Sequence, residues 1–296
     1  MSNTTADLRR KIDGAGDLQS VVRTMKAVAA SSIGQYEKSV SALGDYYHAI
    51  ELGLGACFRE SAQAPLIAEP KGKAGGSTIG AVVFGSDQGL VGQFNDVVAD
   101  FAVKTLKDLH GKVEVWAVGE RVHEALSGAG LPLVGLFGVP NSVNAITPLV
   151  GQILVETEAR QQHGEATELH LFYNRHVSGA GYTPFSQRLL PLDETWRSKL
   201  IKLPWPTHSL PEVLGGGIKT LRALIREYLF VSLFRACAES LASENASRLA
   251  AMQRAEKNID ELLEDLNRTF HRVRQSGIDE ELFDVVSGFE ALNQKE

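Results

Sequence analysis

The sequence predicts an α/β protein in which a long antiparallel coiled coil of the N- and C-terminal helices carries an inserted Rossmann-like α/β domain. Three observations support this fold class. Residues 4–58 and 218–296 contain no proline, both stretches repeat apolar residues every three or four positions, and the middle alternates β-branched runs with helical stretches. We place the N-terminal helix at residues 1–60, the α/β domain at 77–205 and the C-terminal helix at 209–296.

The N-terminal helix is predicted from an apolar seam whose members follow one another at steps of three or four residues. Glycines within it each weaken the helix by up to ~1 kcal/mol relative to alanine, so this helix needs a partner. The N-terminal seam consists of Leu8, Ile12, Ala15, Leu18, Val22, Met25, Ala29, Ile33, Tyr36, Val40, Leu43, Tyr47, Ile50 and Leu54.

The middle of the chain begins after a loop-like linker, Pro65–Ser77, that is rich in proline, glycine and lysine. The short runs "TIGAVVFGS", "KVEVWAVG" and "TELHLFYNRH" are typical of buried strands, and "TPFSQRLLPLD" (183–193) alternates like an edge strand. Strands that alternate with helices predict a mainly parallel sheet. The helices expected between them are Gln93–Leu109, Glu120–Ser127 and Asn144–His163.

The C-terminal helix repeats the same period, with charged residues on the sides between the apolar positions. We expect this C-terminal seam to be the partner of the N-terminal one. About 70 helical residues would give a rod of ~100 Å, and rods reach, link or transmit force. The C-terminal seam consists of Leu249, Met252, Ala255, Ile259, Leu262, Leu266, Phe270 and Val273.

The composition argues against several classes of function. A net charge of -6 disfavours nucleic acid as the main partner, because phosphate binding needs a basic field. No run approaches the roughly 20 apolar residues that span a bilayer. The two cysteines and eight histidines show no metal-ligand spacing, and no G-x-S-x-G motif appears. These patterns supply no candidate catalytic residue, metal ligand or cofactor site apart from the glycine-rich loop described next.

The stretch "IGAVVFGSDQGLVGQFN" (79–95) resembles the start of a phosphate-binding loop, because a strand runs through glycines into a helix. Its glycines, Gly85, Gly89 and Gly92, fit neither the Rossmann fingerprint nor a Walker A loop. The favoured interpretation is a structural turn in which Asp87 and Asn95 bond to the backbone. Nucleotide binding stays open as the alternative.

Late in the C-terminal helix, "FHRVRQSGIDEEL" carries a polar cluster that includes Arg274 and Gln275. These residues form either a solvated helix face or a directed contact on a partner, since arginine and glutamine each make several hydrogen bonds. The pattern alone leaves both interpretations open.

Three segments of the chain resemble the γ subunits of F-type ATP synthases. They are "LRRKIDGAGDLQSVVRTMKAVAASS" near the N-terminus, "GSDQGLVGQFN" in the middle, and "ESLASENASRLAAMQRAEKN" continuing through "VRQSGIDEEL" to "SGFEAL". The resemblance follows the whole chain in order. Gln88 and Val91 replace the family's arginine and cysteine, and Asp17-Leu18, Ser32 and Phe289 also depart from its pattern. Such departures are typical of a divergent branch, such as an alternative F-type ATPase.

The resemblance implies a rotor shaft that turns inside a ring of α and β subunits, and it implies that the nucleotides bind in that ring. The partners would be the α, β and ε subunits and the membrane c-ring, at the cytoplasmic face of a bacterial cell membrane. Arg274 and Gln275 match a pair that contacts a β-subunit loop. Met25 matches a methionine on the facing helix near that contact, with Arg23 and Lys26 beside it. The glycine loop would be a structural turn.

Two alternatives remain beside this interpretation. One is a nucleotide-dependent enzyme built on the α/β domain, and the other is a coiled-coil scaffold that does not rotate.

Overall fold

The computed structural model describes residues 4–60, 78–162, 168–177, 181–209, 211–213 and 217–293. The expected linker Pro65–Ser77 lies outside these ranges, as does His163. The chain divides into two compact units, Met1–Val28 with Leu249–Glu296, and Ala29–Arg248. Two long helices, α1 (Thr5–Glu60) and α6 (Gly217–Asn293), each contribute residues to both units. The expected segments 1–60, 77–205 and 209–296 divide the chain by element, whereas the compact units cut across both helices.

The larger unit, 29–248, is built on a five-stranded sheet in the order β3-β2-β1-β4-β5. The strands are β1 (Thr78–Phe84), β2 (Lys112–Val118), β3 (Leu133–Phe137), β4 (Glu168–Val177) and β5 (Gly181–Leu190). β1 pairs in parallel with β2 and β4, β2 pairs in parallel with β3, and β5 runs antiparallel to β4. The mainly parallel sheet and its alternating edge strand are confirmed. β3 was missed because its five residues form a short apolar run interrupted by glycine.

The helices of this unit are α2 (Phe94–Lys107), α3 (Glu120–Gly128), α4 (Val143–Gln162) and α5 (Glu194–Ile201). Their first three members lie where the sequence predicts helices. α5 was not expected, but it has a clear start signal. The Asp193 side chain accepts a hydrogen bond from the backbone N–H of Trp196 at 2.8 Å, which is the geometry of a helix N-cap.

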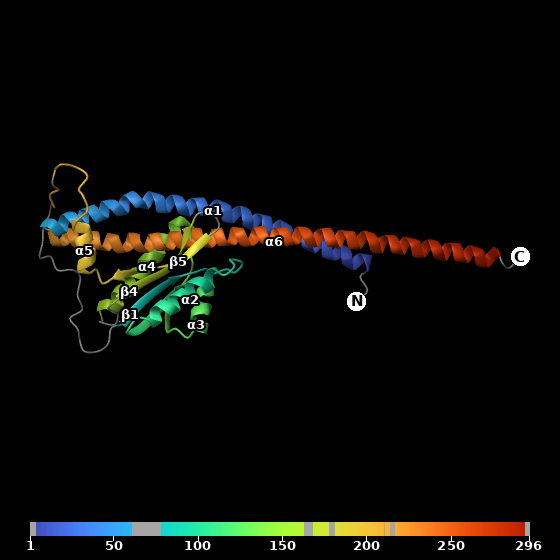
Figure 1. The fold of residues 1–296 in the computed structure, drawn as a ribbon, viewed down its shortest axis with the longest axis horizontal. Coiled ribbons are helices and arrows are strands. Elements are labelled where there is room, and N and C mark those ends of the chain that lie inside the picture. The colour runs from blue at the N-terminus through green and yellow to red at the C-terminus, as the bar shows by residue number, and fades with distance from the viewer. Residues whose placement is uncertain are drawn as a thin grey trace. The chain divides into compact units, whose positions relative to one another are not determined.

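Alternate residues of β1 enter different cores on the two faces of the sheet. Ile79, Ala81 and Val83 pack with buried residues of α2 and α3, which lie together along one face (Figure 1). Val82 and Phe84 belong to the other core, which also contains residues of α4 and of α1 and α6. Because both faces are covered, β1 is buried from Ile79 to Phe84, as expected for a parallel sheet.

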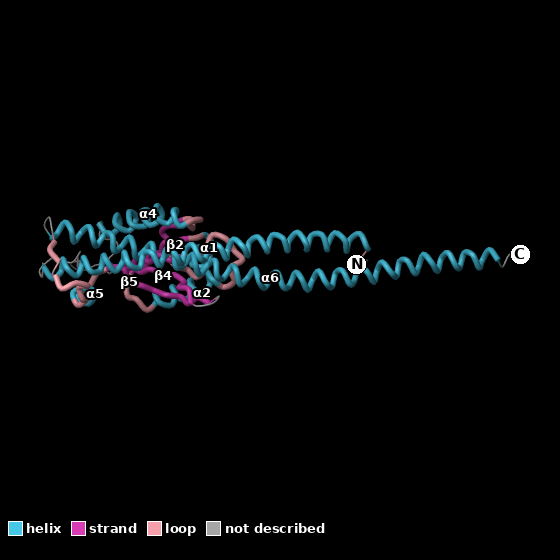
Figure 2. Tube along the Cα trace, turned by 90° about the horizontal axis from the view of Figure 1, so that it is seen from above, coloured by secondary structure: helices cyan, strands magenta, loops and turns pink. Residues whose placement is uncertain are grey.

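Within the larger unit α1 and α6 run antiparallel and side by side (Figure 2). The rings of Tyr47 and Tyr228 lie 5.6 Å apart, and the Tyr46 hydroxyl donates to Glu227 at 3.0 Å. The two cysteines, Cys57 and Cys237, are free thiols buried in the same core. The antiparallel pair of terminal helices with an inserted α/β domain is confirmed, and its packing on one face of the sheet is a finding of the structure.

The smaller unit also contains an antiparallel pair formed by α1 and α6. Gln19 contacts Asp260, and Arg23 contacts Glu256, so residue numbers rise along one helix as they fall along the other. Val22, Met252 and Ile259 form the buried centre of this pair.

The predicted seams hold at every position except two. Leu18 is 53% exposed and Leu262 is 50% exposed, so their assignment to the seams was wrong. Gln19 and Leu263 lie on the inner faces instead. At each helical turn, a step of three or of four residues leaves two adjacent positions as candidates for the seam. Which of the two faces the partner helix depends on how the helices pack.

Candidate functional site

Two of the three glycines in the loop that follows β1 are favoured by the structure, one by close packing and one by its backbone conformation. A Cβ on Gly85 would lie 2.3 Å from the Cβ of Val122 on α3, so only glycine fits there. Gly92 adopts a φ of 60°, which favours glycine, and Leu90 adopts the same φ of 60° with its side chain 63% exposed. Gly89 has open space around it. The close approach at Gly85 and the conformation at Gly92 therefore shape the turn.

Asp87 and Asn95 hold this loop through hydrogen bonds to the backbone. The N–H of Ser86 donates to Asn95 Oδ1 at 2.9 Å, and Asn95 Nδ2 donates to the Ser86 hydroxyl at 2.9 Å. The Asp87 carboxylate accepts from the N–H of Glu120 at 3.0 Å and from that of Val139 at 2.9 Å. One carboxylate thus ties together the chain segments that follow β1, β2 and β3.

The crevice at the carboxyl ends of β1 and β4 is filled by α6. In doubly wound α/β folds, ligands bind where neighbouring strands lead to opposite sides of the sheet. Here the Ser243 hydroxyl donates to the carbonyl of Asn174 at 2.9 Å, and the Ser247 hydroxyl donates to that of Val91 at 2.5 Å. Polar side chains of the chain's own helix therefore stand where a nucleotide would bind. The run "SENAS" (243–247) was a signal for this, since it places small polar residues in the middle of a helix.

A buried ion pair lies next to this crevice and was not predicted from the sequence. Glu244 accepts a hydrogen bond from Arg248 at 2.6 Å, and the two side chains are only 7% and 13% exposed. Burial raises the pKa of Glu244, the Arg248 charge opposes that shift, and the charge of Asp87 adds to it. Removal of one partner would leave the other charge buried and unpaired.

A cavity of about 470 Å³ opens beside the glycine loop. Its charged lining residues are Asp96 in the first turn of α2, and Arg121 and Glu124 of α3. Arg121 already donates to Glu124 at 3.0 Å, so the lining carries two carboxylates and one paired cation. A phosphate group would meet net negative charge there, which disfavours a nucleotide at this loop.

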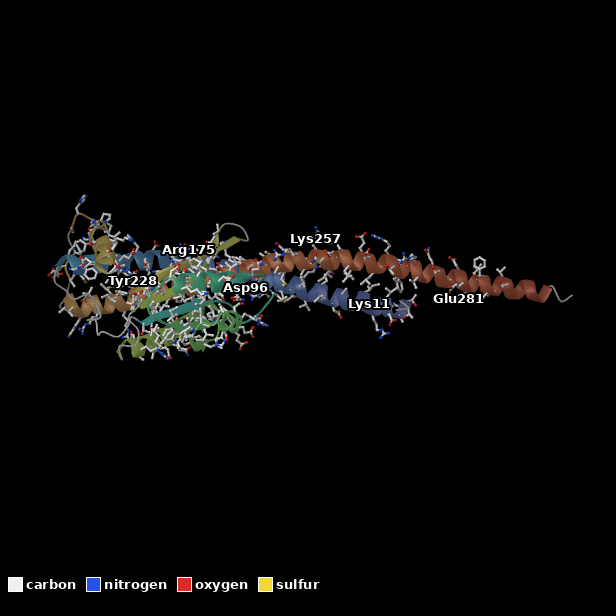
Figure 3. All side chains as sticks on the ribbon, turned by 60° about the horizontal axis from the view of Figure 1, so that its bottom comes forward. Lys11, Asp96, Arg175, Tyr228, Lys257 and Glu281 are labelled. Carbon is white, nitrogen blue, oxygen red and sulfur yellow. The ribbon has the colours of Figure 1, made fainter. Side chains whose placement is uncertain are left out.

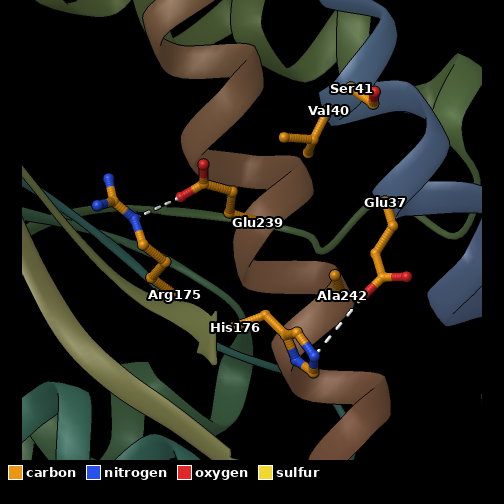
Figure 4. Close-up of a pocket in the computed structure, with 7 residues that line it drawn as sticks. All are labelled: Glu37, Val40, Ser41, Arg175, His176, Glu239 and Ala242. Atoms are coloured by element: carbon orange, nitrogen blue, oxygen red, sulfur yellow. Dashed lines mark hydrogen bonds and ion pairs between the residues drawn. The ribbon is translucent and has the colours of Figure 1, made fainter. Parts of the chain in front are cut away.

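A second cavity, of about 310 Å³, lies between α1, β4 and α6 of the larger unit (Figure 4). Arg175 donates to Glu239 at 3.0 Å, and His176 lies 3.6 Å from Glu37. The Arg175 guanidinium also stacks over the ring of Phe185, 3.7 Å from its centroid. Each ionisable side chain that lines this cavity lies against another one, so the arrangement fits a structural junction of three elements.

A charge cluster of Arg23, Lys26 and Glu256 marks the surface of the smaller unit. Arg23 Nε donates to Glu256 Oε1 at 3.0 Å, and Lys26 Nζ donates to Glu256 Oε2. These hydrogen bonds, that of Lys26 first, lower the pKa of Glu256. Met25 packs beneath the cluster, against the buried centre of the helix pair.

Arg274 and Gln275 are both exposed, and among the described residues neither makes a hydrogen bond or an ion pair. The pairing of Arg23 with Glu256 places Arg274 opposite the start of α1 rather than opposite Met25. Eighteen residues separate Glu256 from Arg274, which is ~27 Å along a helix. The expectation that Met25 lies near the Arg274 and Gln275 contact is therefore wrong for this register.

The described residues contain neither a cluster of metal ligands nor a helix that could cross a membrane. Across these residues, no group of three or more histidine, cysteine, aspartate or glutamate side chains could hold a metal ion. No described helix is both long enough and apolar enough to cross a bilayer.

Comparison with known proteins identifies the family. A model of the ATP synthase family matches residues 4–292. The chain belongs to this family. An ATP synthase gamma chain of Salinibacter ruber is 27% identical over 97% of this chain and 98% of the relative. A gamma chain of Syntrophus aciditrophicus is 28% identical over 97% of both chains. The resemblance carried by the three sequence segments is confirmed.

Solved structures of ATP synthases share the fold. The rotor of the Euglena gracilis mitochondrial enzyme aligns with a TM-score of 0.63 at 16% identity, over 93% of this chain and 98% of that one. The central stalk and c-ring of the Tetrahymena thermophila mitochondrial enzyme align with a TM-score of 0.55 at 20% identity, over 79% of this chain and 99% of that one. This chain therefore shares its fold with rotor and central-stalk structures of ATP synthases.

Proposed function

We propose that this chain is the gamma subunit, the central-stalk rotor, of an F-type ATP synthase. It couples ion-driven rotation of the membrane ring to ATP synthesis or hydrolysis in the α and β subunits. The proposal rests on one observation. Residues 4–292 match the ATP synthase family, and the relatives that align with this chain over almost their whole length are gamma chains. The chain itself is non-catalytic, because the β subunits perform the reaction.

The end of α6 supports a place inside a surrounding ring. In the smaller unit α1 lies beside Lys257 but not beside Glu281 (Figure 3). Past Gly277, this unaccompanied helix exposes large apolar side chains, which in soluble proteins mark a surface that another protein covers. Their exposed fractions are 50% for Ile278, 61% for Leu282, 72% for Phe283, 73% for Val285 and 46% for Val286. A ring of α and β subunits would cover them.

Rotation by such a shaft needs a stiff body and unequal faces. The helix pair is held by its buried seams, and its two helices, of 56 and 77 residues, differ in sequence, so each shaft angle would present a different surface to each β subunit. Binding affinity then follows shaft angle, which is a coupling between distant sites. The partners are the α, β and ε subunits and the c-ring. The chain joins the membrane through the complex, at the cytoplasmic face in a bacterial cell.

The proposed contacts to the β subunits are Arg274 and Gln275 at one level of the shaft and Arg23 and Met25 at another. Among the described residues the side chains of Arg274 and Gln275 make no hydrogen bond or ion pair, and both are exposed, so they are available for directed hydrogen bonds to a partner. The glycine loop, with Gly85, Asp87, Gly89, Gly92 and Asn95, serves as a structural turn.

The test of the proposed function is assembly. The chain is co-expressed with α, β and ε subunits of an F-type ATPase, and a tag on this chain is used for purification. We expect a stoichiometric complex that hydrolyses ATP. A complex that forms but shows no rotation of this chain in single-molecule imaging would favour a static scaffold. Failure to retain α and β subunits, combined with saturable nucleotide binding by this chain, would favour a nucleotide-dependent enzyme.

The contact residues have their own test. We expect Arg274→Ala with Gln275→Ala to change ATP turnover about tenfold, since a charge-assisted hydrogen bond contributes ~1.5–3 kcal/mol and would be made at some angles only. Thermal unfolding of the complex should stay unchanged, because both residues are exposed. A matched control is Gln253→Ala with Arg254→Ala, an exposed pair of the same composition on the same helix. Equal turnover in the two variants would show that Arg274 and Gln275 form a solvated face.

A further inference from the structure

Glu256 is a single carboxylate that binds two cations of the facing helix. Arg23 occupies one of its oxygens and Lys26 the other. The Glu256 side chain is 18% exposed, whereas those of Lys26 and Arg23 are 34% and 58% exposed. The carboxylate is thus the sheltered member, and the two cations form the outer surface.

The two hydrogen bonds decide what Arg23 offers to a partner. Its Nε is held by Glu256, so the guanidinium is fixed on the helix pair and keeps only its terminal nitrogens for other contacts. Lys26 gives its ammonium to the same carboxylate. The cluster therefore carries a net charge of +1 instead of the +2 of its cations alone.

The other charged groups near the cluster do not replace this carboxylate. One helical turn further along the pair, Asp260 accepts a hydrogen bond from Gln19. On α6 itself, Glu261 faces Lys257 at 3.8 Å with both side chains largely exposed. Among the described residues, Glu256 is the carboxylate that holds both Arg23 and Lys26.

We propose that Glu256 masks and positions Arg23 and Lys26, so that the contact proposed for Arg23 stays weak and this level of the shaft does not adhere to acidic groups of the surrounding ring. The inference rests on the proposed rotor function and adds a positioning residue to it. A surface that must pass several subunits in turn works best with weak and uniform contacts. Two unmasked cations would instead form charge-assisted hydrogen bonds with any carboxylate they pass, and those bonds would hold the shaft at one angle.

The experiment replaces Glu256 in the assembled complex. Glu256→Gln removes the charge, keeps the size of the side chain and unmasks both cations. We expect ATP turnover to fall about three- to tenfold at low ionic strength and to recover at high salt, because exposed charges are screened. Glu261→Gln is the matched control, since it makes the same charge change five residues away on the same helix. It should leave turnover and its salt dependence unchanged.

A second variant separates masking from a purely structural role. Adding Lys26→Gln to Glu256→Gln returns the cluster to a net charge of +1, and it should restore turnover at low salt although the ion pairs stay broken. A structural role predicts the opposite, with turnover lost in both variants and no recovery in salt. Turnover of Glu256→Gln that equals or exceeds the wild type at low salt overturns the proposal. If the wild-type complex itself does not assemble or turn over, the proposed rotor function fails instead.

Discussion

Two neighbouring positions of α6, one inside the seam and one outside it, give a sharp test of the helix pair. Ile259 is 6% exposed and packs with Val22 and Met252, whereas Leu262, three residues on, is 50% exposed. Ile259→Ala deletes buried methyl groups and leaves a cavity. Such changes lower the free energy of unfolding by about 2–5 kcal/mol. We expect a loss at the low end, about 2 kcal/mol, because several residues that pack around Ile259 are only partly buried. Leu262→Ala should cost ~0.5 kcal/mol or less.

Amide hydrogen exchange measures this difference where it arises. We expect Ile259→Ala to speed exchange in the part of α1 near Val22 by roughly 30-fold, since about 1.4 kcal/mol is a factor of ten. Exchange in β1 of the larger unit should stay as in the wild type and serves as the internal control. If Leu262→Ala speeds exchange near Val22 as much as Ile259→Ala does, the assignment of Ile259 to the seam is wrong.

Three further outcomes are expected. Asp87→Ala should lower the free energy of unfolding by about 1–2 kcal/mol in a denaturant titration, because the N–H groups of Glu120 and Val139 lose their acceptor; a variant as stable as the wild type would contradict this. Burial alone would raise the pKa of Glu114, but hydrogen bonds from Lys112 and Arg160 bring it below the usual 4.5; the stabilisation is therefore complete above pH 4.5 and is lost as pH falls through the lowered value. Melting curves of wild type and Glu114→Gln should converge in acid, and a gap that stays constant with pH would refute that account. The purified chain should show no saturable binding of labelled ATP at micromolar concentration, since carboxylates line the loop cavity and α6 fills the crevice; one-to-one binding would reopen the enzyme alternative.

Much of the fold could be predicted because it is written in local periodicity. The three-to-four-residue repeat predicted both long helices, and the runs around Val82, Trp116 and Leu171 predicted the central strands of a parallel sheet. Such patterns are visible in the sequence because each element must present one face to a core, whichever partner covers it. β3 and α5 were missed because they are short, and short elements carry too few residues to establish a period.

In the candidate sites, too, the sequence predicted the residues that have a local signal but not their distant partners. Asp87 and Asn95 could be selected as backbone-bonding residues, since these side chains favour turns after strands. Their partners, Glu120 and Val139 for Asp87, lie 33 and 52 residues away in the chain, and nothing local indicates them.

The sequence by itself determined which residues are apolar, where the helices and the central strands lie, and which family the chain resembles. The tertiary structure alone decided which of two neighbouring residues enters a seam, as at Ile259 and Leu262, and which charges meet, as at Arg23 and Glu256. The physical reason is the separation along the chain between the residues that interact. Helical and strand periods arise within a few residues, whereas the register of two helices is set by packing between side chains that are more than 200 positions apart in the chain.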